Sequence, residues 1–208
     1  MNASDTTRQK IIDAARARFA HYGYGKTTMA DVADDCAMSP GNLYRYFAGK
    51  LDIAEEIARA ASIRTTEELS HILIQSDRSA AERLHDFLFH DLRATYHALE
   101  KDPKLVEMAQ IITQERPRFH DEGLEREREV LVRIVEFGNI SGEFHVADPL
   151  FIAEMIQSAT LKFSYPQLFS SLSLDLLERE LEGVYQLVIA GLRAGVSAVE
   201  APQDMVDA

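Results

Sequence analysis

Apolar residues recur every three or four positions along almost the whole chain, and this spacing is typical of amphipathic helices. In residues 6–22 the apolar positions include Ile11, Ala15 and Phe19, and Gly23 follows where helices commonly end. The same spacing, with capping residues, proline or glycine at the ends, predicts further helices over residues 28–36, 39–47, 51–75, 79–101, 103–115, 118–138, 149–164 and 173–195. We therefore expect an all-α fold.

Two of these predicted helices are short, and only a tight connection separates them. The first begins at Thr28, which can cap the helix together with Asp31, and the second begins at Ser39, another common capping residue. Leu43 and Phe47, four positions apart, can face inward and hold the second helix, which is too short to be stable alone. This is the pattern of a helix-turn-helix, whose second helix enters the major groove of DNA.

The charge distribution fits a DNA-binding tip on an acidic body. The 208 residues carry a net charge of −12, of which residues 1–50 contribute +2 and residues 51–208 contribute −14. Because phosphate attraction is screened beyond about 8–10 Å, a mildly basic tip can still bind DNA. The single cysteine, Cys36, excludes an internal disulfide, and it is either a small core residue or a redox sensor.

No segment of the sequence has the character of a targeting or membrane-spanning element. The N-terminus lacks an apolar core region, and no apolar run is long enough to cross a bilayer. We therefore expect no signal peptide and no membrane partner, and the cysteine usage fits a cytoplasmic protein. The length allows one or two domains.

The last two predicted helices carry long apolar faces, and small residues in the final helix would let another helix approach closely. Such faces suit a four-helix bundle shared between two subunits, or they close the core of a single subunit. The candidate dimer-interface residues are Ile152, Ile156, Ala159, Phe163, Leu177, Leu181, Val184, Val188 and Leu192.

A group of polar residues on the predicted helix 79–101 is the one sequence feature that could support a metal site or a catalytic site. Asp86, His90 and His97 can share a helix face, which would allow a metal or a polar effector, but one face gives poor tetrahedral geometry. We expect these residues at the surface, with no metal and no cofactor. The sequence has no nucleophile elbow, zinc-binding His pair or glycine-rich phosphate loop, so we do not expect an enzyme.

The first fifty residues resemble the DNA-binding domain of the TetR family of bacterial repressors. The matching features are Ile12, Ala15, Phe19, Gly23-Tyr24, Thr27-Thr28, Val32-Ala33, the run Ser39-Pro-Gly-Asn-Leu-Tyr-Arg-Tyr-Phe47, and Lys50. The resemblance implies a three-helix DNA-binding domain over residues 1–50 and a helical effector-binding and dimerisation domain over residues 51–199. Residues 200–208 read as a disordered tail.

The resemblance also implies roles for individual residues in DNA binding. Residues at the start of the second short helix would reach base edges, and those around it would bind phosphates and fix the register. Arg45 is also a candidate for guanine, whereas Tyr44 and Tyr46 could instead pack against the first helix. The base-reading candidates are Ser39, Pro40, Gly41 and Asn42, and the phosphate candidates are Thr28, Tyr44, Arg45, Tyr46 and Lys50.

Members of the family are generally homodimers that release a palindromic DNA operator when a small molecule enters the C-terminal domain. The resemblance therefore predicts a repressor, although repression and activation are not distinguished by the sequence itself. Taken singly, each candidate effector-pocket residue fits plain core better than a pocket wall. These candidates are Phe87, Leu88, Leu92, Tyr96, Met108, Ile112, Phe119, Phe163 and Tyr165.

Two features depart from the family pattern. Ala37 stands in the turn where the family usually has glycine, and alanine in a left-handed conformation costs on the order of 1 kcal/mol. Asp34 and Asp35 add negative charge to the first short helix, on the side that we expect to face away from the phosphates. These features leave open a helical adaptor that has kept the helix-turn-helix shape without binding DNA.

Overall fold

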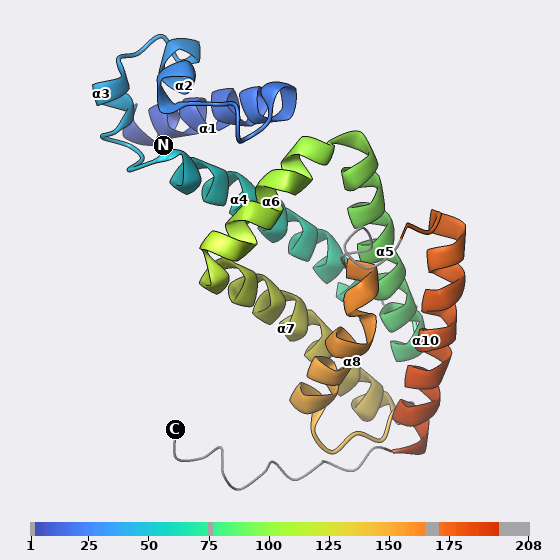
Figure 1. Cartoon of the computed structure of the whole chain (residues 1–208). Coiled ribbons are helices and arrows are strands. Elements are labelled where there is room, and N and C mark those ends of the chain that lie inside the picture. The colour runs from blue at the N-terminus through green and yellow to red at the C-terminus, as the bar shows by residue number, and fades with distance from the viewer. Residues whose placement is uncertain (1–2, 75–76, 165–170, 196–208) are drawn as a thin grey trace, which may run out of the picture. The chain divides into compact units, whose positions relative to one another are not determined.

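The computed structural model describes residues 3–74, 77–164 and 171–195, and every regular element in these ranges is a helix (Figure 1). The elements are α1 (Ala3–Tyr22), α2 (Met29–Asp35), α3 (Pro40–Leu43), α4 (Lys50–His71), a short 3-10 helix η1 (Ile72–Ile74), α5 (Ala80–Lys101), α6 (Pro103–Glu115), α7 (Pro117–Ser141), α8 (Pro149–Ser164) and α10 (Leu174–Ala194). The all-α prediction is confirmed. None of these helices combines the length and the apolar character that crossing a bilayer requires.

The helix boundaries agree closely with the prediction, with one difference in the second short helix. Its α-helical part, α3, covers only Pro40–Leu43, and looser turns continue the segment to Phe47. The predicted helix over residues 51–75 is α4 followed by η1. Gly23 ends α1 with φ +89°, as its position in the sequence predicts. The predicted tail over residues 200–208 lies outside the described residues.

The chain packs into two compact units, and several long helices pass from one to the other. Unit 1 contains the residues up to Glu67 together with Tyr96–Glu125, and unit 2 contains Glu68–Thr95 and the residues from Arg126 onward. This division by packing differs from the predicted functional boundary at residue 50, because most of α4, the end of α5, all of α6 and the start of α7 belong to unit 1 with the first three helices.

Unit 1 has a continuous apolar core. Met108 and Ile112 of α6 are part of it, and Lys104 of α6 donates a hydrogen bond to the carbonyl oxygen of His21 at the end of α1. The helix-turn-helix is therefore built on α1, α4 and α6 together. The buried members are Ile11, Ala15, Phe19, Met29, Val32, Ala33, Cys36, Leu43, Phe47, Ile53, Ala54, Ile57, Met108 and Ile112.

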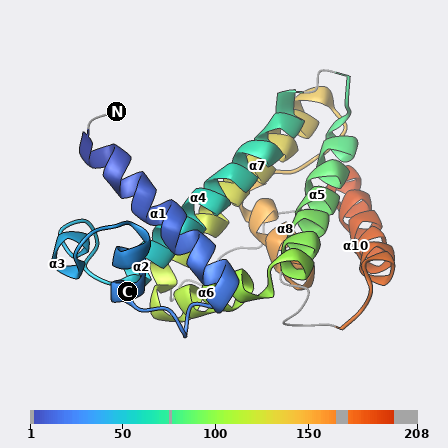
Figure 2. The ribbon, with the colours of Figure 1, turned by 90° about the horizontal axis from the view of Figure 1, so that it is seen from above.

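Unit 2 is built from α5, α7, α8 and α10, and α8 and α10 pack against one another (Figure 2). The Tyr185 hydroxyl of α10 donates to the carbonyl oxygen of Ala81 in the first turn of α5, at 3.0 Å. Gly138 lets the Phe144 ring lie directly on α7, because a Cβ at that position would be only 2.0 Å from the ring. This contact fixes the turn that leads to α8.

The structure corrects most of the predicted dimer interface. Ala159 is exposed, and Val184 and Val188 are half-buried. The other predicted residues face the core of the same chain. The apolar spacing of α8 and α10 predicts that these faces are buried, but it does not show whether the same chain or a partner buries them. These buried residues are Ile152, Ile156, Phe163, Leu177, Leu181 and Leu192.

The turn between α2 and α3 keeps a left-handed residue although that residue is alanine. Ala37 has φ +54°, its N–H donates to Asp34 O, and the N–H of Met38 donates to Ala33 O, both at 3.0 Å. This is the Schellman arrangement that usually ends a helix with glycine. The turn therefore has its ordinary geometry, and alanine carries the strain.

We expect Ala37→Gly to leave the free energy of unfolding unchanged or to raise it by up to about 1 kcal/mol. Relief of the left-handed strain, about 1–2 kcal/mol, exceeds or offsets the added flexibility of the unfolded chain, about 0.4–1 kcal/mol. Ala30→Gly, at an exposed position within α2, is the matched control and should lower stability by about 1 kcal/mol. Equal losses for the two variants in urea unfolding would contradict the strain at Ala37.

Candidate nucleic-acid interface

The reading segment, residues 39–47, starts with a well-formed cap. Ser39 has extended backbone angles, its side-chain oxygen accepts a hydrogen bond from the Asn42 N–H at 3.3 Å, and Pro40 occupies the first helical position. Beyond Leu43 the backbone continues in turns, with the Phe47 N–H donating to Leu43 O at 3.2 Å. The segment therefore has a fixed shape despite its length.

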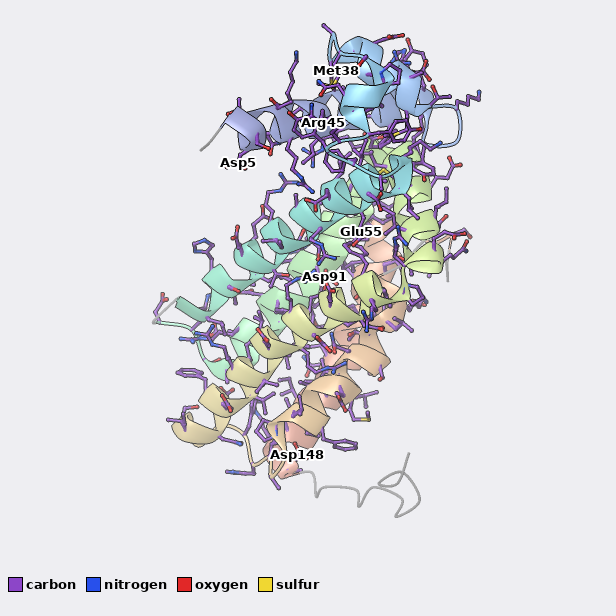
Figure 3. The ribbon with its side chains drawn as sticks, turned by 90° about the vertical axis from the view of Figure 1, so that its left-hand side faces the viewer. Asp5, Met38, Arg45, Glu55, Asp91 and Asp148 are labelled. Atoms are coloured by element: carbon purple, nitrogen blue, oxygen red, sulfur yellow. The ribbon has the colours of Figure 1, made fainter. Side chains whose placement is uncertain are left out.

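The two faces of the reading segment divide as the sequence predicts. Leu43 and Phe47 are buried in the core of unit 1, whereas Tyr44 is 53% exposed. Arg45 is exposed as well (Figure 3). Tyr46 is half-buried and packs against that core, as the alternative to a phosphate contact allows. Tyr44 and Arg45 are therefore the long side chains that this segment presents outward.

Gly41 and Asn42 lie at the start of the segment, next to the exposed Ser39 and Pro40. Gly41 is exposed, and a Cβ added to it would meet nothing within 4 Å. The fold itself therefore has no need of glycine at this position. A missing side chain at the leading end of the segment permits a close approach by something outside the chain.

Thr28 caps α2 as predicted, and its side chain is fully engaged in doing so. Its oxygen accepts from the Asp31 N–H at 3.2 Å, its hydroxyl donates to the Asp31 carboxylate at 2.7 Å, and its own N–H donates to the same carboxylate at 2.8 Å. This is a complete capping box. The predicted phosphate contact of Thr28 would have to share the hydroxyl proton with Asp31.

The acidic side of α2 is neutralised from α1. The Arg18 guanidinium donates to both carboxylate oxygens of Asp35, one of them at 2.8 Å, and lies 3.3 Å from the Asp31 carboxylate. The hydrogen bond from Arg18 lowers the pKa of Asp35, and hydrogen bonds from Thr28 lower the pKa of Asp31. Both carboxylates thus stay ionised and paired, which limits their repulsion of a phosphate backbone.

Lys50 closes the segment, but its ammonium group is turned into unit 1. It donates hydrogen bonds to the carbonyl oxygens of Tyr24 and Thr27, both at 2.7 Å, and lies 4.2 Å from the centre of the Tyr24 ring. Desolvation lowers the pKa of this ammonium. Lys50 therefore ties the start of α4 to the turn before α2, and we do not carry its predicted phosphate contact into the proposed function.

A network of ion pairs joins α4 to the connection between α6 and α7, and local sequence patterns do not reveal it. Arg116 lies 2.9 Å from the Asp52 carboxylate and 3.3 Å from that of Glu55. Arg59 pairs with Glu55 at 2.9 Å and also with Glu122 of α7. The sequence shows only that charged residues lie on these helices, because their pairing depends on the packing of α6.

The predicted effector-pocket residues do not form one group. Met108 and Ile112 are buried in the core of unit 1, and the half-buried Phe119 packs against that core, so these three residues lie apart from the candidates in unit 2. Tyr96 is half-buried in unit 1, and Tyr165 lies outside the described residues. The predicted residues that remain together, all buried in unit 2, are Phe87, Leu88, Leu92 and Phe163.

The polar group on α5 is dispersed over separate partners. His90 lies 3.6 Å from Glu68 and His97 lies 3.5 Å from Glu100, while Asp86 lies near His85. Among the described residues, no set of three or more His, Cys, Asp or Glu side chains is placed to hold a metal ion. Asp86 and His90 are half-buried, and only His97 of the three is exposed as expected.

We expect Lys50→Met to lower the free energy of unfolding by about 1–3 kcal/mol, because two carbonyl groups lose a charged hydrogen-bond donor. Lys26→Met removes the same charge from an exposed position in the turn that Lys50 contacts. This control should change the free energy of unfolding by no more than about 0.5 kcal/mol. Thermal unfolding of the two variants checks this. A structural role would be refuted by unchanged stability together with a weaker salt dependence of DNA binding.

Two family models match the chain. The model described as "Bacterial regulatory proteins, tetR family" matches residues 11–61, which contain the helix-turn-helix. The model described as "Tetracyclin repressor-like, C-terminal domain" matches residues 80–185, about half of the chain. The two matches thus cover the reading segment and most of the helices of unit 2.

Known proteins resemble the DNA-binding end of this chain in sequence and nearly the whole chain in fold. A curated relative from Escherichia coli K12, named "Probable acrEF/envCD operon repressor", is 39% identical over 51 residues, which are 24% of this chain and 23% of the relative. A transcriptional regulator of the TetR/AcrR family from Thermobifida fusca has a TM-score of 0.65 at 24% identity, over 89% of this chain and 98% of that one. FadR from Bacillus subtilis, solved in complex with stearoyl-CoA, has a TM-score of 0.63 at 22% identity, over 88% and 98% of the chains.

Similarity to the curated relative is therefore confined to the DNA-binding end, about a quarter of its length, whereas the fold is shared along nearly the whole chain. With both family models matched and the helix-turn-helix geometry in place, the chain belongs to the TetR family of bacterial transcriptional regulators.

Proposed function

We propose that the chain is a repressor that binds a palindromic DNA operator as a homodimer and releases it when a small molecule binds unit 2. The observation that carries the DNA-binding part is the outward pair Tyr44 and Arg45, on a capped segment whose leading end is open at Gly41. Arg45 suits a phosphate or a guanine, and Ser39 and Asn42 lie where base edges come within reach.

Exposed apolar residues on α8 and α10 support the proposed dimer. Met155 and Leu161 of α8 and Leu176 and Leu187 of α10 are exposed, and Leu187 is 77% exposed. Gly183 is exposed on α10 between two of these residues, with nothing within 4 Å of its Cβ position. This outward face, opposite the buried one, suits a partner's helices packing closely against it. Two recognition segments related by a two-fold axis then read half-sites roughly 34–36 Å apart.

Response to a small molecule is proposed from the family and from the composition of unit 2. The relative FadR was solved with stearoyl-CoA, so a chain of this fold can hold a ligand. In unit 2, Leu88 and Leu92 of α5 and Phe163 of α8 are buried and give the interior an apolar character. A ligand releases DNA only if it binds the released state more tightly than the bound state, typically by about 1–3 kcal/mol.

We expect Arg45→Ala to weaken binding to a palindromic fragment selected from the source genome by about 1–3 kcal/mol. Arg64→Ala removes the same charge from an exposed position on α4 and serves as the control. Fluorescence anisotropy at several salt concentrations measures both variants. If no genomic fragment is enriched by the wild-type chain, even after removal of co-purified ligand, the repressor proposal fails in favour of an adaptor.

We expect Leu187→Glu to convert the dimer to monomer and to weaken operator binding, because it places a charge in the centre of the proposed apolar interface. Ile140→Glu introduces the same charge at a residue of α7 that is 85% exposed and is not part of the proposed interface, so it should leave the dimer intact. Sedimentation velocity separates the two cases. A Leu187→Glu chain that remains dimeric would show that the subunits meet elsewhere.

A further inference from the structure

Arg45 and Asn42 lie on one side of the reading segment. Arg45 is two positions from each of the buried residues Leu43 and Phe47, which is about half a turn of helix, so it lies opposite the core (Figure 3). The Arg45 N–H donates to the carbonyl oxygen of Asn42 at 3.2 Å. This three-residue turn places Asn42 on the same side as Arg45, because positions i and i+3 are aligned in a 3-10 turn.

The fold engages neither of these two side chains. Within the part of the chain that the structure describes, the exposed Arg45 guanidinium and the half-buried Asn42 amide have no hydrogen-bond or ion-pair partner. By contrast, Arg18 is bound to Asp35, and the Lys50 ammonium group is bound to two carbonyl oxygens. A guanidinium and an amide are therefore presented together, with their hydrogen-bonding groups open to a ligand.

The leading end of the segment lets these groups approach a surface closely. Gly41 lies four positions before Arg45, so it shares that side of the segment. It is exposed, and a Cβ at this position would meet nothing within 4 Å, so the fold has no internal need of glycine here. With only a hydrogen atom at this position, the segment can lie deep in a groove, where the short Asn42 side chain reaches base edges.

We propose that Arg45 reads a guanine and Asn42 reads an adenine in the major groove of each half-site, and that the two base pairs lie within two steps of one another. This rests on the proposed function, because it names bases that the operator contains. Arginine forms two hydrogen bonds with N7 and O6 of guanine, and asparagine forms two with N7 and N6 of adenine. Three residues of 3-10 helix rise about 6 Å, compared with about 3.4 Å for one base step.

The position of Arg45 decides between a base and a phosphate. When a segment lies in the groove, the middle of its outward face points at the base edges, and the side chains on either side of it meet the phosphates. Arg45 is in the middle of that face, and Tyr44 and Tyr46 are its neighbours. The guanidinium therefore reaches the base edges.

The test removes single acceptor atoms from the DNA. A site is selected from random DNA with the full-length protein, and one half-site is then resynthesised with 7-deazaguanine or 7-deazaadenine at each purine in turn. These analogues keep base pairing but lack the N7 acceptor. We expect one deazaguanine position to weaken binding about tenfold, and one deazaadenine position within two steps of it to weaken binding about threefold.

Each loss should disappear when the matching side chain is removed. Arg45→Ala should bind equally well with guanine or deazaguanine at the critical position, and Asn42→Ala should do the same for adenine, while each variant keeps the loss at the other base. Arg64→Ala removes the same charge as Arg45→Ala from an exposed position on α4 and should keep both losses. Neither Arg45→Ala nor Asn42→Ala removes a side-chain contact that holds the described fold, so we expect both variants to fold.

A phosphate contact at Arg45 gives a different result. Arg45→Ala would then weaken binding to every sequence by the same factor and would reduce the salt dependence. That result overturns the inference and leaves the repressor proposal standing. Coupling at only one of the two residues, or at bases more than two steps apart, overturns it as well. A chain that selects no site at all contradicts the repressor proposal itself, and the base assignments fail with it.

Discussion

The burial of Leu43 and Phe47 is the constraint on which the DNA-reading end depends. A helix of a single turn has almost no stability of its own, so its orientation is that of the core into which these two side chains fit. That core is shared by α1, α4 and α6, and the Arg8 guanidinium covers the Phe47 ring at 4.6 Å while pairing with Glu56. The outward direction of Tyr44 and Arg45 follows from the inward direction of their neighbours.

Many of the basic residues near the reading segment serve the fold rather than a DNA backbone. Arg18 neutralises the acids of α2, and the Lys50 ammonium group binds two carbonyl oxygens. The small positive charge of residues 1–50 therefore overstates the charge that is free to meet phosphate, and Arg45 is an exposed basic side chain on the reading segment. With an acidic remainder of the chain, binding should depend on a few well-placed contacts, which favours specific sites over DNA in general.

Local patterns in the sequence predicted the features that depend only on neighbouring residues, such as the helix caps. The cap at Ser39 and the capping box at Thr28 depend on neighbouring residues, and the structure contains both. Long-range packing could not be predicted in the same way. The spacing of Leu177 and Leu181 indicates a buried face but not whether the same chain or a partner covers it, and nothing near Met108 in sequence shows that α6 completes the core under α1.

Helix α4 is held in unit 1 by two kinds of contact. Its buried side chains Ile53, Ala54 and Ile57 pack in the same core as Met108 and Ile112 of α6, whereas its charged residues pair with Arg116 and with Glu122 of α7. Partly exposed ion pairs are worth about 0–1 kcal/mol each. The apolar contacts cost more to lose, because opening them leaves cavities in the core. The packing of α6 therefore holds α4 beneath the helix-turn-helix more strongly than the ion pairs of Arg59 and Arg116 do.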